Sequence, residues 1–174
     1  MSKAVMLSVR PKWCEKICSG EKTIEVRKTR PKMNTPFKCY IYCTLQGCNE
    51  FFRVDLGRDV AKWNRGKWAD RKGNVIGEFT CDRIDRLAPA NDPYGIYDID
   101  DDYVFQTCLE NGALWDYGHG TPLYGWHIFD LRIYDTPRDL GEFIGLRTMK
   151  NGFELRELDH PPQSWCYVLE DYHA

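Results

Sequence analysis

The sequence predicts an α+β fold in which several short strands form a barrel-like sheet and the helices lie near the start and in the middle of the chain. Short apolar or alternating stretches bounded by Gly and Pro recur along the 174 residues, which is typical of strands. Hydrophobic residues make up 43% of the chain and aromatic residues 14%, which excludes a disordered protein. With no internal repeat or linker, we expect a single domain over residues 1–174.

The first third of the chain is predicted to contain one helix among strands. We expect, in order, a strand at 4–9, a helix at 10–22, and strands at 23–28 and 37–45. Pro11 suits the first position of this helix, and Gly20 suits its C-terminal stop. Trp13 and Ile17 are spaced i, i+4, so they give the helix an apolar stripe.

The rest of the chain is predicted to add further strands and two helices. We expect, in order, a strand at 74–87, a helix at 98–115, a strand pair or one long bent strand at 121–135, a short helix at 136–143, a loop around Gly152, and a closing strand at 163–170. Thr136 and Pro137 suit the cap and first turn of the short helix. Gly77, inside a strand, indicates a bulge or a close backbone approach. Residues 46–74 are an insertion that can be an ordered segment, a short helix or a flap.

Charge is distributed very unevenly along the chain. Residues 1–72 contain 17 Lys and Arg against 7 Asp and Glu, whereas residues 73–174 contain 7 against 19, although the net charge is only −2. One interpretation is a basic face that meets a polyanion such as nucleic acid. The other interpretation is that the two halves neutralise each other in the folded protein.

The sequence gives no pattern that is typical of a metal site, a cofactor site or a membrane segment. The eight cysteines include no CxxC pair, so we expect no metal and no cofactor, and we expect free thiols that pack as small hydrophobes. The acidic run at 98–102 lacks the Gly and Glu positions of a calcium loop. No apolar run approaches the roughly 20 residues of a membrane span, and the N-terminus lacks the apolar core of a signal peptide. We therefore expect a cytoplasmic location.

The stretch MLSVRPKWCEKICSGEKTIEVRKTRP combines an apolar strand with Ser, a helix with Trp, and the motif G-x-K-[ST]-x-E-x-R. The motif residues are Gly20, Lys22, Thr23, Glu25 and Arg27. In this it resembles ASCH domains, a branch of the PUA-like superfamily. The segments GNVIGEFTCDRI, LYGWHIFDLRIYDTP and PPQSWCYV are similar to the longer bacterial and phage members, so that the resemblance covers residues 5–168 and suggests a prophage origin.

The resemblance implies a PUA-like mixed β-barrel with flanking helices, a cleft beside the first helix, and binding of RNA or another nucleic acid. Some members of the family are amidohydrolases that deacylate N4-acetylcytidine, and others are ribonucleases. Their catalytic Lys corresponds to Lys22, but their nucleophilic Thr corresponds to Glu25, which cannot act as an alkoxide-like nucleophile. Thr23 is close by in a different register. The family's catalytic Glu has no counterpart that the motif places, and Glu78 and Glu110 are the candidates for it.

Elementary chemistry of the motif allows two interpretations. On a strand, Glu25 and Arg27 share a face and Lys22 lies at the entrance, so Glu25 can hold both cations by charge-assisted hydrogen bonds. Arg27 can then present its guanidinium to a phosphate, a carboxylate or a guanine edge, or Glu25 can itself accept from a base amine. The alternative is an exposed cross-strand ion pair worth roughly 0–1 kcal/mol and without functional meaning.

Further candidate binding residues combine cations, aromatic rings and polar groups. They are Lys12 and Trp13 in RPKW, Arg30 after the motif, Gln163, Ser164 and Trp165 in PPQSW, and the KWNRGKW segment at 62–68. Core packing is the alternative for Trp13. For His127, a hydrogen-bonded structural position is the alternative to an acid–base role.

The first functional hypothesis is binding of RNA, another nucleic acid or a nucleotide-like ligand in a cleft framed by Lys22, Glu25 and Arg27. The second hypothesis is an enzyme, an amidohydrolase or ribonuclease acting on nucleosides or RNA, with Lys22, Thr23 and Glu25 as candidate catalytic residues. The third is a protein–protein adaptor whose basic half meets an acidic partner. The departure at Glu25 favours binding over catalysis.

Overall fold

The computed structural model describes residues 2–45, 71–90, 96–150 and 152–170. Most of the expected insertion, including KWNRGKW, lies outside the described residues. Within the described ranges the chain forms ten strands, three α-helices and one 3₁₀ helix, which confirms the α+β class. The chain divides into two compact units, which we describe separately. No helix in the described ranges is both long and apolar enough to cross a bilayer.

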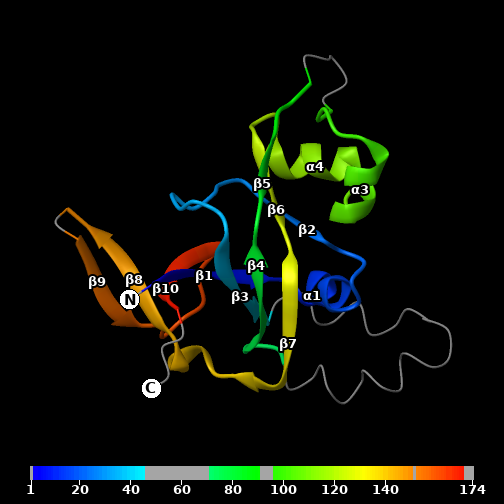
Figure 1. Ribbon diagram of the computed structural model, residues 1–174. Helices are drawn as coiled ribbons and strands as arrows, with labels where there is room; N and C mark the ends of the chain where they lie inside the picture. Colours follow the sequence, from blue (N-terminus) through cyan, green and yellow to red (C-terminus); the bar gives the residue numbers. More distant parts are fainter. Residues whose placement is uncertain (1, 46–70, 91–95, 151, 171–174) are drawn as a thin grey trace, which may run out of the picture. The chain divides into compact units, whose positions relative to one another are not determined.

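The first unit comprises residues 1–15, 38–79 and 131–174, and we call it the seven-strand unit after its sheet. The strands of this sheet are β1 (Lys3–Val9), β3 (Phe37–Cys43), β4 (Val75–Cys81), β7 (Phe129–Arg138), β8 (Ile144–Met149), β9 (Gly152–Glu157) and β10 (Trp165–Leu169). Their order is β7-β4-β3-β1-β10-β8-β9, so β7 and β9 are the edges (Figure 1). The sheet is mixed, because β1 pairs parallel with β3 and antiparallel with β10.

One face of this sheet carries an apolar core. Met6, Tyr40 and Val168 are buried there together with Phe143, whose ring lies 5.0 Å from that of Tyr40 between centroids. Phe143 follows a 3₁₀ helix, η2 (Leu140–Glu142). The structure corrects the short helix expected at 136–143, because β7 continues through Arg138 and the cap is Asp139.

The second unit comprises residues 16–37 and 80–130, and we call it the three-strand unit. Its elements are β2 (Ile24–Arg27), β5 (Ile84–Leu87), α3 (Asp101–Thr107), α4 (Asn111–Gly118) and β6 (Leu123–His127), and the strand order is β2-β6-β5. Helix α1 (Pro11–Cys18), whose residues are divided between the two units, begins at Pro11 as expected, and Gly20 follows its end at φ 79°. Val26 and Leu123 form a buried cluster with Tyr97 and Leu114.

Three expectations about element boundaries were wrong for local reasons. The helix expected at 98–115 is broken, because Cys108 takes a left-handed φ of 54° and ends α3. Asp100 caps α3 by accepting from the Tyr103 amide, in agreement with the acidic start. The loop expected around Gly152 is instead the start of β9, which pairs with β8. The strand expected at 74–87 is divided into β4 and β5, which belong to different sheets.

At Gly77 in β4 the backbone of a neighbouring strand comes very close, as expected for a glycine inside a strand. A Cβ at this residue would lie 2.5 Å from the backbone oxygen of Arg132 on β7, which is far inside van der Waals contact. Gly77→Ala therefore forces the two strands apart, and we expect a loss of about 1–3 kcal/mol in the free energy of unfolding, measured by urea denaturation.

Gly112 in α4 is the matched control for this substitution. A Cβ there meets nothing within 4 Å. Gly112→Ala should leave stability unchanged or raise it by about 0.4–1 kcal/mol, because Ala restricts the unfolded chain. Equal losses in the two variants would contradict the close approach at Gly77.

Candidate functional site

Strand β2 carries the charged motif and has two different faces. Ile24 and Val26 point to the apolar side, where Val26 joins the buried cluster of the three-strand unit. Glu25 and Arg27 point to the other side, because they alternate with these residues. The antiparallel register with β6 places Glu25 opposite Trp126 and Arg27 opposite Tyr124. The charged face is therefore lined by aromatic side chains.

Glu25 lies between two cations, and the three side chains form a buried ion cluster. Its Oε1 is 2.9 Å from Nη2 of Arg27, and its Oε2 is 3.4 Å from Nζ of Lys22. The side chains of Lys22, Glu25 and Arg27 are only 1%, 8% and 9% exposed. The expected bridging by Glu25 is thus present, and the alternative of an exposed ion pair is wrong.

Lys22 also attaches β2 to the end of a helix. Its ammonium donates to the backbone oxygen of Thr107, the last residue of α3, at 2.6 Å. The next amide, that of Thr23, donates to the oxygen of Gln106 at 3.0 Å. The carbonyl end of a helix attracts a cation, so Lys22 satisfies this end and the Glu25 carboxylate together. Thr23 itself is exposed, and its hydroxyl lies 3.5 Å from the Gln106 side-chain oxygen.

The buried ion cluster has the properties of a structural clamp, that is, a group of side chains that stabilises the fold through contacts with one another. One carboxylate between two cations leaves a net charge of +1 in a position with little access to solvent. Removing one member of a buried ion pair costs roughly 3–5 kcal/mol, because the remaining charge is uncompensated. The side chains expected to frame a cleft are therefore committed to one another and to α3.

We expect Glu25→Gln to destabilise the protein by about 3–5 kcal/mol, because two buried cations lose their carboxylate while the side-chain shape is kept. Urea denaturation followed by tryptophan fluorescence measures this change.

Glu21→Gln is the control for this charge change, because its carboxylate pairs with Lys16 at 2.9 Å on the surface, where the Glu21 side chain is 59% exposed. An exposed pair contributes about 0–1 kcal/mol, so a loss at Glu25 no larger than this would contradict the clamp.

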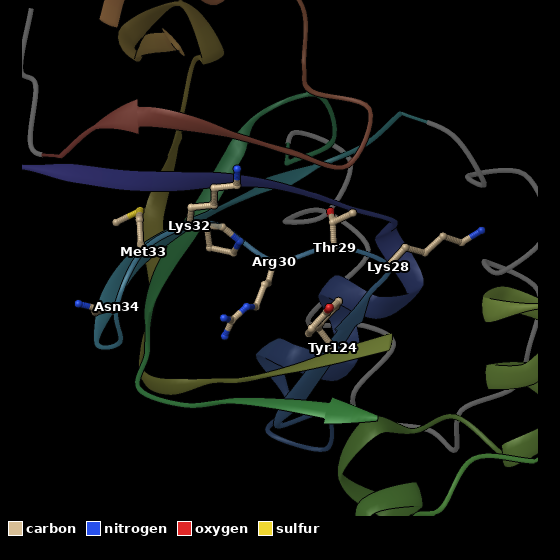
Figure 2. Close-up of a pocket in the computed structure, with 8 residues that line it drawn as sticks. Lys28, Thr29, Arg30, Lys32, Met33, Asn34 and Tyr124 are labelled. Atoms are coloured by element: carbon tan, nitrogen blue, oxygen red, sulfur yellow. The ribbon is translucent and has the colours of Figure 1, made fainter. Parts of the chain in front are cut away.

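A hollow of about 530 Å³ begins where the motif ends. It is lined by Lys28, Thr29, Arg30, Pro31, Lys32, Met33, Asn34 and Tyr124. Figure 2 shows the Arg30 side chain extending from the loop toward the side on which the Tyr124 ring lies, whereas Lys28 extends away from the ring. We call this feature the basic hollow, since three of its eight residues are cations. Its volume falls within the range of small-molecule sites.

Tyr124 contributes an aromatic ring to the lining of the basic hollow, and an arginine lies opposite it on each neighbouring strand. It lies opposite Arg27 on β2 and opposite Arg86 on β5, and residues in register share one face of the sheet. Arg86 is exposed. Arg30 was expected as a binding residue, whereas Tyr124 and its cross-strand neighbour Arg86 were not, because their proximity arises from strand register, which is not visible in the local sequence.

The remaining predicted binding residues lie in the seven-strand unit and have contacts of their own. The Lys12 ammonium lies 4.3 Å from the centre of the Trp13 ring, which is half-buried. Trp165 pairs with Leu7 of β1, and its ring packs 5.3 Å from that of Tyr167. The Ser164 backbone oxygen accepts from the amide of Ser8. Gln163 is exposed. A ligand role for these residues remains a prediction.

His127 takes the hydrogen-bonded position that was the alternative to an acid–base role. Its Nε2 is 2.7 Å from Oδ2 of Asp85, and its side chain is 17% exposed. The guanidinium of Arg83 contacts the same carboxylate at 3.1 Å. Asp85 on β5 is therefore shared by His127 on β6 and by Arg83, which directly precedes β5, in a network that connects the two strands.

Two cysteines of the described residues, Cys81 and Cys166, behave as packed thiols. Cys81 is fully buried, and burial raises the pKa of its thiol to about 12. Burial likewise raises the pKa of Cys166 to about 11. Such thiols stay protonated at neutral pH and are poor nucleophiles and ligands. In the part of the chain that the structure describes, no group of three or more His, Cys, Asp or Glu is placed to hold a metal ion.

Comparison with solved structures identifies the fold. The ASCH protein of Zymomonas mobilis matches 97% of this chain and 88% of its own length, with 20% identity and a TM-score of 0.50. A tyrosine-to-phenylalanine variant of the same protein matches 98% and 93%, with 18% identity and a TM-score of 0.52. No protein-family model and no curated protein matches the sequence. At these identities the similarity establishes the fold, so this chain has the ASCH fold that the sequence resemblance implied.

Proposed function

We propose that the protein binds single-stranded RNA, or a nucleotide-like ligand, in the basic hollow beside the G-x-K-T-x-E-x-R motif. The observation that carries this proposal is the combination of three cations with an aromatic ring in a hollow of about 530 Å³. Single-stranded nucleic acid is bound by such surfaces, with cations on the phosphates and rings stacked on the bases. The ASCH resemblance supports RNA as the polymer.

The roles of the residues follow from their positions. Tyr124 offers a ring on which one base can stack, with Arg86 beside it in register. Arg30 and Lys32 meet phosphate groups from the loop. The buried ion cluster does not touch the ligand in this scheme: it fixes the strand from which the loop departs.

We expect Arg30→Ala to weaken binding of a short mixed-sequence RNA at every salt concentration. It should also reduce the slope of log K against log salt by about 0.7, the contribution of one single-strand phosphate. Fluorescence anisotropy over a salt series, with DNA of the same sequence in parallel, measures both effects. Lys150→Ala, an exposed cation on the β8–β9 turn, is the control and should behave as wild type. A wild-type protein with no affinity for RNA, DNA or nucleosides at low salt would refute the proposal.

The stacking role of Tyr124 makes a separate prediction. Tyr124→Ala should cost about 1–3 kcal/mol of binding free energy, a loss of roughly 5- to 150-fold in affinity. Tyr124→Phe keeps the ring and should bind within about twofold of wild type. Equal losses in both variants would point to the hydroxyl instead and would exclude stacking as the role of this residue.

The same panel of variants decides between binding and the alternative functions. An amidohydrolase or ribonuclease would turn over N4-acetylcytidine or cleave RNA, and Lys22→Ala would abolish that activity. An adaptor would show neither affinity nor turnover. Because the Lys22 ammonium is occupied by Thr107 and Glu25, we expect binding without turnover.

A further inference from the structure

Strand β9 is an exposed edge of the seven-stranded sheet. It ends the strand order, and each of its six residues is exposed. Its two large apolar side chains are about half accessible, 48% for Phe153 and 53% for Leu155. In Figure 1 it is the outermost strand on the left of its sheet. An edge strand presents backbone N–H and C=O groups to a partner strand, and apolar side chains favour such pairing.

Apolar residues lead to this edge across four strands. The registers place Val5 opposite Tyr167, Tyr167 opposite Leu146, and Leu146 opposite Leu155. Because residues in register share a face, these side chains form one cross-strand row that ends at the exposed Leu155. A partner strand with an apolar residue at the matching position would extend the row.

The other face of β9 carries charges of both signs. Glu154 lies opposite Arg147 of β8, and Arg156 lies opposite Gly145. Arg156 also lies near Asp159: His160, and to a smaller extent Arg156, lower the pKa of that exposed carboxyl. Glu154 and Arg156 are therefore the two charges that this face would offer to a partner strand.

The sequence Glu-Leu-Arg at 154–156 is complementary to itself when read in the opposite direction. An antiparallel pairing centred on Leu155 brings Leu155 against its own copy. It brings Glu154 against the second copy's Arg156, and by symmetry Arg156 against the second copy's Glu154. A two-fold axis thus creates one apolar pair and two opposite-charge pairs at the centre of the pairing, and it places Phe153 opposite Glu157 on either side of them.

Neighbouring registers lose this complementarity. Shifting the centre by one residue brings Glu154 against its own copy, or Arg156 against its own copy, and like charges directly opposite are destabilising. A half-step shift places Leu155 opposite Glu154 or Arg156 of the second copy, which breaks the apolar row. The register centred on Leu155 is therefore the favoured one.

We propose that β9 pairs with β9 of a second copy of this chain, antiparallel and centred on Leu155, to form a two-fold symmetric dimer with a continuous sheet. The proposal is independent of the RNA-binding function. Two short edge strands bury a limited area, so the dimer should dissociate on dilution.

Sedimentation velocity over a concentration series tests the dimer directly. Wild type should shift from the 20.4 kDa monomer towards twice that mass as concentration rises. Arg156→Glu replaces both opposite-charge pairs by like-charge pairs and should weaken dimerisation by about tenfold or more. Arg132→Glu makes the same charge change on β7, the other edge, and should dimerise as wild type does. Leu155→Lys places two ammonium groups on the two-fold axis and should be monomeric.

A mixing experiment tests the register. Glu154→Arg alone places the introduced guanidinium against Arg156 of the second copy and should be monomeric, as should Arg156→Glu alone. Mixed together, the two variants restore an opposite-charge pair at both positions and should form a heterodimer, detected by co-purification through a tag on one of them.

Melting curves establish that each variant is folded. A monomeric wild type at all concentrations would overturn the proposal, as would a dimer insensitive to Arg156→Glu and Leu155→Lys. If folded single variants fail to pair when mixed, the register is refuted.

Discussion

The three-strand unit depends on one carboxylate, that of Glu25, held between two buried cations. Arg27 belongs to the same strand, whereas Lys22 precedes it and reaches the carbonyl end of α3. Through these contacts the carboxylate connects the strand, its entry turn and the helix. Isolated buried charges are very unfavourable, so this arrangement tolerates only conformations in which all three groups meet. The cluster therefore contributes to the uniqueness of the local structure.

This constraint separates the residues that hold the structure from those that can reach a ligand. Lys22, Glu25 and Arg27 are buried, while the residues that follow from Lys28 to Asn34 open onto the basic hollow. A strand fixed by buried charges gives its adjoining loop a defined starting point. Such preorganisation lowers the entropy cost of binding, which is why sites are effective when rigid elements support them. The motif can matter for binding without touching the ligand.

The sequence predicted features that depend on local spacing and missed those that depend on distant contacts. The start of α1 at Pro11, the acidic cap of α3 and the pairing of Glu25 with its neighbours follow from spacing of a few residues. The break at Cys108 was not visible, because a non-glycine residue takes a left-handed φ there. The position of Tyr124 between Arg27 and Arg86 required the register of three strands. The sequence alone therefore identified the charged residues of the motif but not which side chains of the neighbouring strands lie beside them.

The two edges of the seven-stranded sheet differ in how they are protected. Strand β7 contains Pro137, which lacks an N–H donor, and Asp130 at a φ of 49°, which interrupts regular extended backbone. Both features discourage another strand from pairing with that edge. Strand β9 has no proline, and its charges alternate in sign around a central leucine. Charges on an edge strand usually prevent pairing with other strands. When two copies of β9 run antiparallel, however, Glu154 of each copy meets Arg156 of the other, so the same charges disfavour most strands and favour an identical one. The same residues can thus protect β9 against non-specific association and select a second copy of the chain.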